Sequence, residues 1–172
     1  YFVGNIVIAR GNDDKSRPQI IDGQQRILTL WMYLKVLAII TNVSRLEEML
    51  SIRDWEDEKV LSKIDSMVFE EDDQSGIEDL LTWKQDDFKS KTKEISKLRQ
   101  IQSNAVYIYK WLHEYFSRID NASQTAFWRY FIDRVYLLPI VLDGKDMAEA
   151  TTRALTIFET INNRGLDLAD AD

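Results

Sequence analysis

The chain has 172 residues, a formal net charge of −7 and no cysteine. This length is sufficient for one domain with a substantial core. The missing cysteines exclude disulfides and thiolate zinc sites within the chain and fit a reducing compartment. A single histidine, His113, excludes a metal site built from several of its histidines. The longest apolar run, residues 28–40, is too short to span a bilayer, so we expect a cytoplasmic protein that makes no membrane contact.

The negative charge is concentrated in the middle of the sequence. Residues 42–90 hold 15 of the 29 acidic residues. The overall sign argues against a broad DNA-binding face, which needs clustered Lys and Arg. A local anion site stays open, because a few backbone amides and one arginine can hold a phosphate. We interpret the acidic run itself as solvated surface.

The first 41 residues predict a strand pair followed by a helix. Residues 2–9 alternate and are rich in β-branched side chains, residues 11–16 form a turn cluster, and residues 19–21 form a short second strand. From Gln24 the apolar residues recur every three or four positions, which predicts a helix to about Thr41. It is apolar nearly all round, so we expect it to be buried on several sides.

The middle of the chain predicts a helical block. Short helices are expected near residues 54–67 and 76–83, with a solvated loop at residues 70–76. Residues 92–117 carry the clearest amphipathic pattern, with His113 at the helix surface beside the apolar stripe. A helix over residues 122–133 follows. Its aromatic residues are expected to face a core rather than to serve as a stacking platform for bases: Phe127, Trp128, Tyr130 and Phe131.

The last part predicts one more strand and one more helix. Residues 135–142 read as a strand in which Pro139 indicates an edge position or a bulge. Residues 148–161 form a helix that ends at residues 162–165, with Gly165 as its left-handed cap. Its inward residues are expected to be Ala154, Leu155, Ile157, Phe158 and Ile161. The predicted fold class is α+β: a small mixed sheet from residues 1–41 and 134–172, with residues 42–133 as a variable helical insertion.

Two segments carry residues suited to ligand chemistry. The first is Asp22-Gly23-Gln24-Gln25-Arg26, where a strand turns into a helix. Amides at a helix N-terminus carry partial positive charge, a glycine admits a ligand oxygen, and an arginine can bind phosphate through two N–H groups. The two glutamines can contact a phosphate, a base edge or an attacking water. The plain alternative is a turn in which Asp22 caps the helix.

The second segment spans residues 158–166 at the end of the last predicted helix. Glu159 and Asn162 are three residues apart and share a face, with Asn163 and Arg164 next to them. A carboxylate beside amides and a guanidinium can bind a second part of a ligand or a metal, or position a water. The alternative is a capped helix with a surface arginine.

These segments resemble the DGQQR-motif domains, the N-terminal part of GmrSD-type modification-dependent restriction systems and related phage-defence proteins. The opening residues 1–7 are similar to the family's YFLGSIV strand, residues 22–26 match its DGQQR motif, and residues 158–166 resemble its FExxNxRG signature. The three occur in the family's order. The chain departs at Leu28, where the family's RLTTL has a threonine. The family's upstream YQRxYxW-type segment and C-terminal nuclease motif are absent, so we expect this sequence to be part of a longer protein.

The resemblance implies a ParB/sulfiredoxin-like fold that binds nucleoside triphosphates and, in the full-length protein, hydrolyses them with Mg²⁺. By that analogy hydrolysis would gate DNA cleavage by a nuclease domain or partner subunit. The implied catalytic residues are Gln24, Gln25, Arg26 and Glu159. The implied nucleotide-binding residues are Asp22, Gly23, Gln24, Gln25, Arg26, Thr29, Asn162 and Arg164. The rival functions are a nucleotide sensor without turnover, a module that contacts DNA directly, and a purely structural domain.

Overall fold

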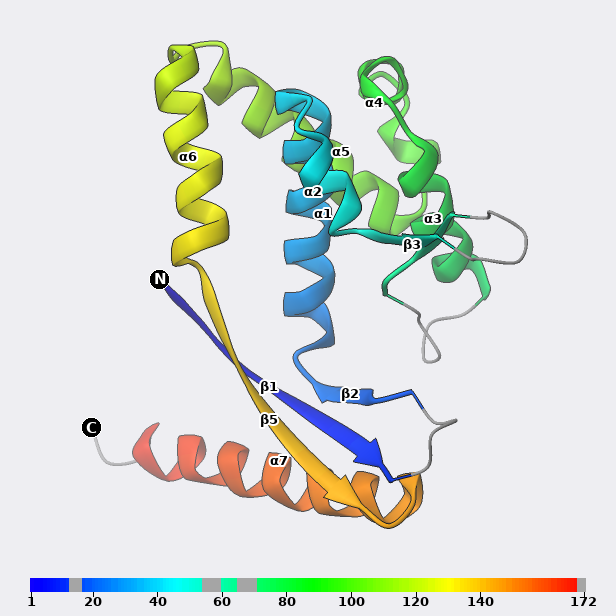
Figure 1. Cartoon of the computed structure of the whole chain (residues 1–172), viewed down its shortest axis with the longest axis vertical. Helices are drawn as coiled ribbons and strands as arrows, with labels where there is room; N and C mark the ends of the chain where they lie inside the picture. Colours follow the sequence, from blue (N-terminus) through cyan, green and yellow to red (C-terminus); the bar gives the residue numbers. More distant parts are fainter. Residues whose placement is uncertain (13–16, 54–59, 65–70, 170–172) are drawn as a thin grey trace. The chain divides into compact units, whose positions relative to one another are not determined.

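The computed structural model describes residues 1–12, 17–53, 60–64 and 71–169 (Figure 1). The chain forms two compact units. The first contains Tyr1–Ile27 and Ile132–Asp172, and the second contains Leu28–Phe131. No helix of the described residues has the length and apolar character needed to cross a membrane.

The first unit is a three-stranded mixed sheet covered by one helix. Strands β1 (Phe2–Gly11), β2 (Gln19–Asp22) and β5 (Tyr136–Gly144) lie in the order β2-β1-β5. The first two are antiparallel, which confirms the predicted hairpin, whereas β5 runs parallel to β1. β5 is an edge strand, as Pro139 predicted, because a residue without an N–H is tolerated there.

Helix α7 (Met147–Ala169) packs along the sheet (Figure 1). Its residues Ala150 and Ala154 are fully buried against Val7 and Ala9 of β1. Small side chains one turn apart let the helix backbone approach the strands closely. Partly buried apolar side chains complete this cluster: Ile21, Leu142 and Met147.

The sequence prediction for this last helix was wrong in two respects. The helix does not end at residues 162–165 but continues to Ala169. A glycine inside a helix costs only about 1 kcal/mol, and the following leucine and alanine residues are good helix formers. Leu155 and Ile161, expected to face inward, are 45% and 41% exposed. Because the sheet has only three strands, the covered stripe of α7 is narrow and is filled by the alanines.

The second unit is mainly helical. Its elements are α1 (Gln24–Thr41, which begins in the first unit), α2 (Ser44–Glu48), the hairpin β3 (Ser51–Arg53) and β4 (Val60–Ser62), α3 (Glu71–Thr82), α4 (Gln85–Lys91), a 3₁₀ turn η1 (Ile95–Lys97), α5 (Gln100–Phe116) and α6 (Asn121–Arg134, which ends in the first unit). Its largest fully buried side chains are Val36, Leu37, Leu50, Ile77, Leu80, Phe88, Val106 and Leu112.

Several predictions for this unit need correction. Residues 71–76, expected as a loop, form the first half of α3. Residues 60–62, expected within a helix near 54–67, form a strand; the other described residues of that segment, 63 and 64, are not helical, and the rest lie outside the described residues. The helix expected over residues 92–117 starts only at Gln100, because Leu98 and Arg99 are extended. Tyr130 of α6 is 56% exposed, although it was expected to face a core. His113 lies on the helix surface as predicted.

We predict that Gly23→Ala destabilises the first unit. Gly23 has φ of +93°, and a Cβ there would lie 2.5 Å from Ile6 Cγ2. A side chain at such a backbone angle costs on the order of 1–3 kcal/mol before the steric clash is added. Urea unfolding should show this loss. Ile6→Ala removes the clashing methyl group but has a cavity cost of its own, so Gly23→Ala should cost less in the Ile6→Ala background than in the wild type when both single variants are measured. An unchanged unfolding midpoint in Gly23→Ala would contradict the described turn.

We also predict a pH signature from Lys35 in α1. Its side chain is 3% exposed and its Nζ donates to the Leu81 carbonyl over 2.8 Å. Burial lowers the pKa of Lys35 below its ordinary value of 10.5, and Glu47 and Asp87 oppose that shift. Just below that value the unfolded chain therefore binds more protons than the folded one, so the free energy of unfolding should gain a component that rises with pH.

Lys35→Met should remove this component. The free energy of unfolding is measured with urea at about pH 8 and about pH 10.5 for both proteins. Its change between the two pH values should be more positive in the wild type than in Lys35→Met. Lys110→Met on the exposed side of α5 controls for the loss of one positive charge. The same pH dependence in wild type and Lys35→Met would show that Lys35 is not buried as described.

Candidate functional site

The turn from β2 into α1 is shaped by a glycine. Asp22 ends β2, Gly23 adopts its positive φ, and the first backbone bond of the helix runs from Ile27 N to Gly23 O over 3.0 Å. The amides of residues 24–26 lie ahead of that bond, where a helix has no internal acceptors for them. Partial positive charge therefore gathers at this turn, as the sequence predicted.

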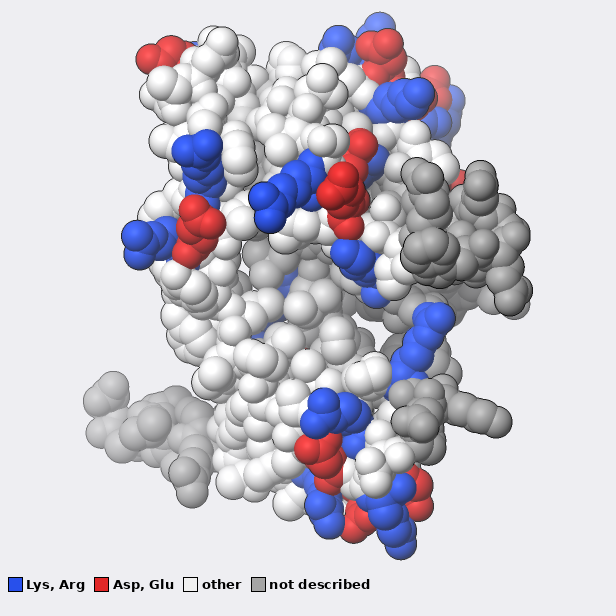
Figure 2. All heavy atoms as spheres, in the orientation of Figure 1, with Lys and Arg blue, Asp and Glu red and all other residues white. Residues whose placement is uncertain are grey.

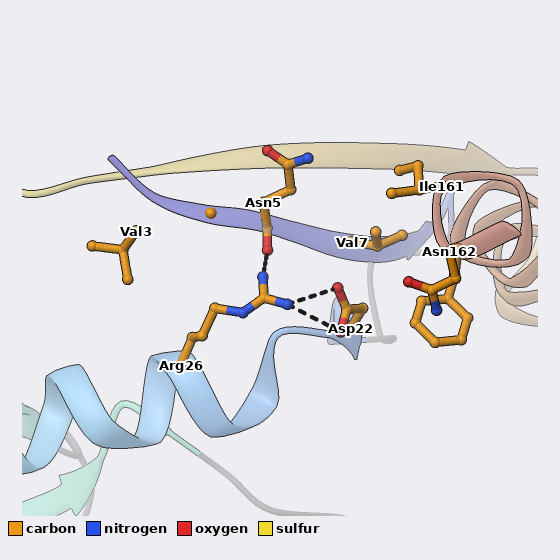
Figure 3. A pocket seen from close by; sticks show the side chains of 9 residues that line it. Val3, Asn5, Val7, Asp22, Arg26, Ile161 and Asn162 are labelled. Atoms are coloured by element: carbon orange, nitrogen blue, oxygen red, sulfur yellow. Dashed lines mark hydrogen bonds and ion pairs between the residues drawn. The ribbon is translucent and has the colours of Figure 1, made fainter. Parts of the chain in front are cut away.

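Arg26 lies one turn into α1 and is held by two partners (Figure 3). Its NH2 group lies 3.2 Å from Asp22 Oδ2, and its NH1 group donates to the backbone carbonyl of Asn5 on β1. The side chains of Arg26 and Asp22 are 37% and 29% exposed. Because a guanidinium carries five N–H donors, these contacts orient Arg26 and leave it capacity for a ligand.

Gly4 makes room for this arrangement. Its φ is +127°, and a Cβ there would lie 3.4 Å from Arg26 NH1. The β1–β5 register also shifts between Phe2 and Gly4. Sequence reasoning missed this contribution of β1. A glycine inside an apolar strand was the available signal, since it often marks a bulge or a close approach of another group.

Two cavities adjoin the Asp22–Arg26 pair. The larger, of about 330 Å³, is lined by Val3, Gly4, Asn5, Val7, Asp22, Arg26, Phe158, Ile161 and Asn162. The smaller, of about 220 Å³, is lined by the six consecutive residues from Ile21 to Arg26. Asp22 and Arg26 line both cavities.

The larger cavity brings together the two motifs found in the sequence. Phe158, Ile161 and Asn162 fall at helical spacing on one side of α7 and line the cavity. Figure 3 shows Ile161 and Asn162 across the site from Arg26. Glu159 is exposed and does not line either cavity, because it points about a quarter turn away from that face. Arg164 belongs to α7, but its side chain lies outside the described part of the chain.

The remaining predicted residues lie around the start of α1. Gln24 donates from Nε2 to the Ile20 carbonyl over 2.8 Å, so its amide is turned toward β2. Gln25 is exposed and lines the smaller cavity. Thr29 is exposed and lines neither cavity.

The carboxylates of the site are few. Asp22 is the one acidic residue among those that line the two cavities. No group of three His, Asp or Glu suited to a metal occurs among the described residues. This donor set provides one carboxylate, which fits Mg²⁺ only where water and phosphate oxygens supply the other ligands.

The surface outside the site carries mixed charge. On the face shown in Figure 2, Lys and Arg side chains lie next to Asp and Glu rather than in one basic patch. An ion pair joins β1 to β5: Arg10 Nε lies 2.6 Å from Asp143 Oδ1, and the hydrogen bond from Arg10 lowers the pKa of Asp143. The pair is exposed and lines neither cavity.

The comparison with known families covers the whole sequence. The profile of the GmrSD restriction endonuclease N-terminal domain matches residues 1–172. No significant match was found among curated proteins or among solved structures. The family resemblance inferred from the motifs at residues 22–26 and 158–166 is thereby confirmed, and the chain belongs to the GmrSD restriction endonuclease N-terminal domain family.

Proposed function

We propose that this domain binds a nucleoside triphosphate at the β2–α1 turn and that its hydrolysis gates DNA cleavage in a cytoplasmic restriction system that defends against phage. The nuclease would be a further domain or a partner subunit. The proposal includes a ParB/sulfiredoxin-like arrangement of the strand-turn-helix segment. The family supplies the restriction context, the motif resemblance implies the nucleotide, and the geometry of the site supports it.

One observation carries the nucleotide proposal. A single cavity is lined by Asp22 and Arg26 from one motif and by Asn162 from the other, although more than 130 residues separate them. The nearby helix N-terminus and Arg26 can stabilise phosphate charge. Phosphoryl transfer depends mainly on positioning and charge stabilisation, and these residue types provide both.

The proposal includes an Mg²⁺ ion that Asp22 would help to hold. A carboxylate at Asp22 would repel phosphate oxygens unless a cation lies between them or Arg26 compensates. We propose that Asp22 contributes one ligand, directly or through water, to an Mg²⁺ that enters with the nucleotide. The metal would neutralise developing charge on the phosphates.

Nucleotide binding without hydrolysis is the second candidate function, and two observations on the predicted catalytic residues favour it. Gln24 uses its amide on the Ile20 carbonyl, and Glu159 does not line either cavity. Of the predicted catalytic residues, Gln24, Gln25 and Arg26 line the smaller cavity, and Arg26 is held there by Asp22 and by the Asn5 carbonyl. We assign the alignment of water to Gln25 in the hydrolytic version of the proposal.

We predict that Arg26→Ala abolishes nucleotide-dependent stabilisation. Saturating nucleotide, at about a hundred times its dissociation constant, should stabilise the wild-type protein by roughly 2.7 kcal/mol. A thermal-shift panel of the intact protein with ATP, GTP, CTP and UTP, with and without Mg²⁺, measures this. Arg10→Ala is the matched control, since it removes an arginine paired with an aspartate outside the cavities. A wild-type protein that responds to none of the four nucleotides would rule the proposal out.

We predict that Gln25→Ala separates hydrolysis from binding. If Gln25 aligns the attacking water, phosphate release should fall by at least about 100-fold while the nucleotide-induced thermal shift is kept. Gln24→Ala should mainly lower stability, because it removes the bond to the Ile20 carbonyl. Phosphate release by Gln25→Ala at the wild-type rate would assign the water to another group. Wild-type protein that binds nucleotide but releases no phosphate would favour the sensor function.

A further inference from the structure

The two cavities beside Asp22 and Arg26 differ in the chemistry of their walls. The smaller is lined only by residues 21–26, which form the turn from β2 into the start of α1. The larger has apolar side chains from two elements, Val3 and Val7 of β1 and Phe158 and Ile161 of α7. We propose, on the basis of the nucleotide-binding function above, that the smaller cavity holds the phosphates, the larger holds the nucleoside, and Asn162 selects the base.

The charge distribution supports this assignment of the phosphates. Among the residues that line the two cavities, Arg26 is the only cation, and it lines both. Gly23, Gln24 and Gln25 at the start of α1 line only the smaller of these two cavities, where the helix N-terminus adds partial positive charge. Phosphates placed instead against Val3, Val7 and Phe158 would lie farther from the first-turn amides and would desolvate their oxygens against apolar side chains, which is costly.

The α7 wall of the larger cavity suits a base. Phe158 is half-buried and Ile161 is 41% exposed, whereas Ala150 and Ala154 of the same helix are fully buried. The cavity therefore lies beside apolar side chains that the sheet leaves uncovered. An aromatic ring can stack on a base, and such stacking tolerates any base.

Asn162 adds the means to discriminate. It is the one side-chain amide whose group points from α7 into the site among the described residues (Figure 3). An amide both donates and accepts, so it can pair with one base edge and leave a mismatched edge unsatisfied. Sites that reject a ligand because a polar group would stay unpaired reach high selectivity. The cavity volume of about 330 Å³ is at the lower end of the range for small-molecule pockets.

The test compares nucleoside triphosphates with inorganic tripolyphosphate, which has the phosphates but no nucleoside. Binding to the intact protein with Mg²⁺ is measured by calorimetry for the wild type, Asn162→Ala, Phe158→Leu and Arg26→Ala. Thr160→Ala is the matched control, because Thr160 is exposed on the same turn of α7, its hydroxyl bonds to the Thr156 carbonyl, and it lines neither cavity.

Asn162→Ala should keep tripolyphosphate affinity within about 2-fold of the wild type and lose roughly 10-fold or more for the preferred nucleotide. Its preference among the four bases should flatten. Phe158→Leu should weaken all four nucleotides alike and leave tripolyphosphate binding unchanged. Arg26→Ala should lose both kinds of ligand, since Arg26 lines both cavities. Thr160→Ala should behave as the wild type.

Two results would overturn the assignment while leaving nucleotide binding intact. In one, Asn162→Ala and Phe158→Leu weaken tripolyphosphate and nucleotides equally, or change neither. In the other, the wild type binds tripolyphosphate as tightly as every nucleotide. A wild type that binds neither class of ligand would instead refute the proposed function, and this inference with it.

Discussion

The parallel pairing of β1 with β5 is the constraint on which the site depends. These strands are joined from Phe2↔Tyr136 to Gly11↔Gly144, although the whole second unit lies between them in the chain. β2 is paired to the other edge of β1 and leads into α1, and β5 leads into α7. One central strand thus holds the starting points of both motif-bearing helices. This pairing brings α7, with Asn162, next to the start of α1, with Arg26, so that both residues line the same cavity.

The sequence predicted the local structure of the first motif well and its surroundings poorly. The change from alternating apolar residues to a helical spacing at Gln24 marks the β2–α1 turn, and the helix bounds Gln24–Thr41 agree with it. The contact between Arg26 and the Asn5 carbonyl, 21 residues apart, could not be predicted, because it depends on the exact register of β1 against β2 and on the conformation of Gly4. In the sequence, the only sign of this tertiary contact is an isolated glycine, Gly4, within an apolar strand.

For the second motif, the sequence indicated the kind of site but not which face of the helix is covered. Its residue types indicated a ligand-binding segment, but the choice of the inward face failed for Leu155 and Ile161 because helical periodicity alone does not reveal how narrow the covering sheet is. Glu159 and Asn162 were expected to share a face, but in the structure Asn162 lines the cavity with Phe158 whereas Glu159 does not. The catalytic and nucleotide-binding roles expected for the residues of both motifs all stay predictions.

Asp22 has two effects on the site: it positions the side chain of Arg26, and it adds a negative charge that a cation must balance. It fixes the guanidinium of Arg26 before any ligand arrives, which lowers the entropy lost on binding. It also places a negative charge beside the proposed phosphate position, and that charge must be offset by Arg26 or by a metal. A partly exposed ion pair between residues four apart in sequence is worth little to stability, on the order of 1 kcal/mol or less. The pair therefore makes better physical sense as a device that positions Arg26 and sets a requirement for a cation than as a support of the fold. The two glycines with positive φ that flank it, Gly4 and Gly23, hold the same arrangement from the backbone side.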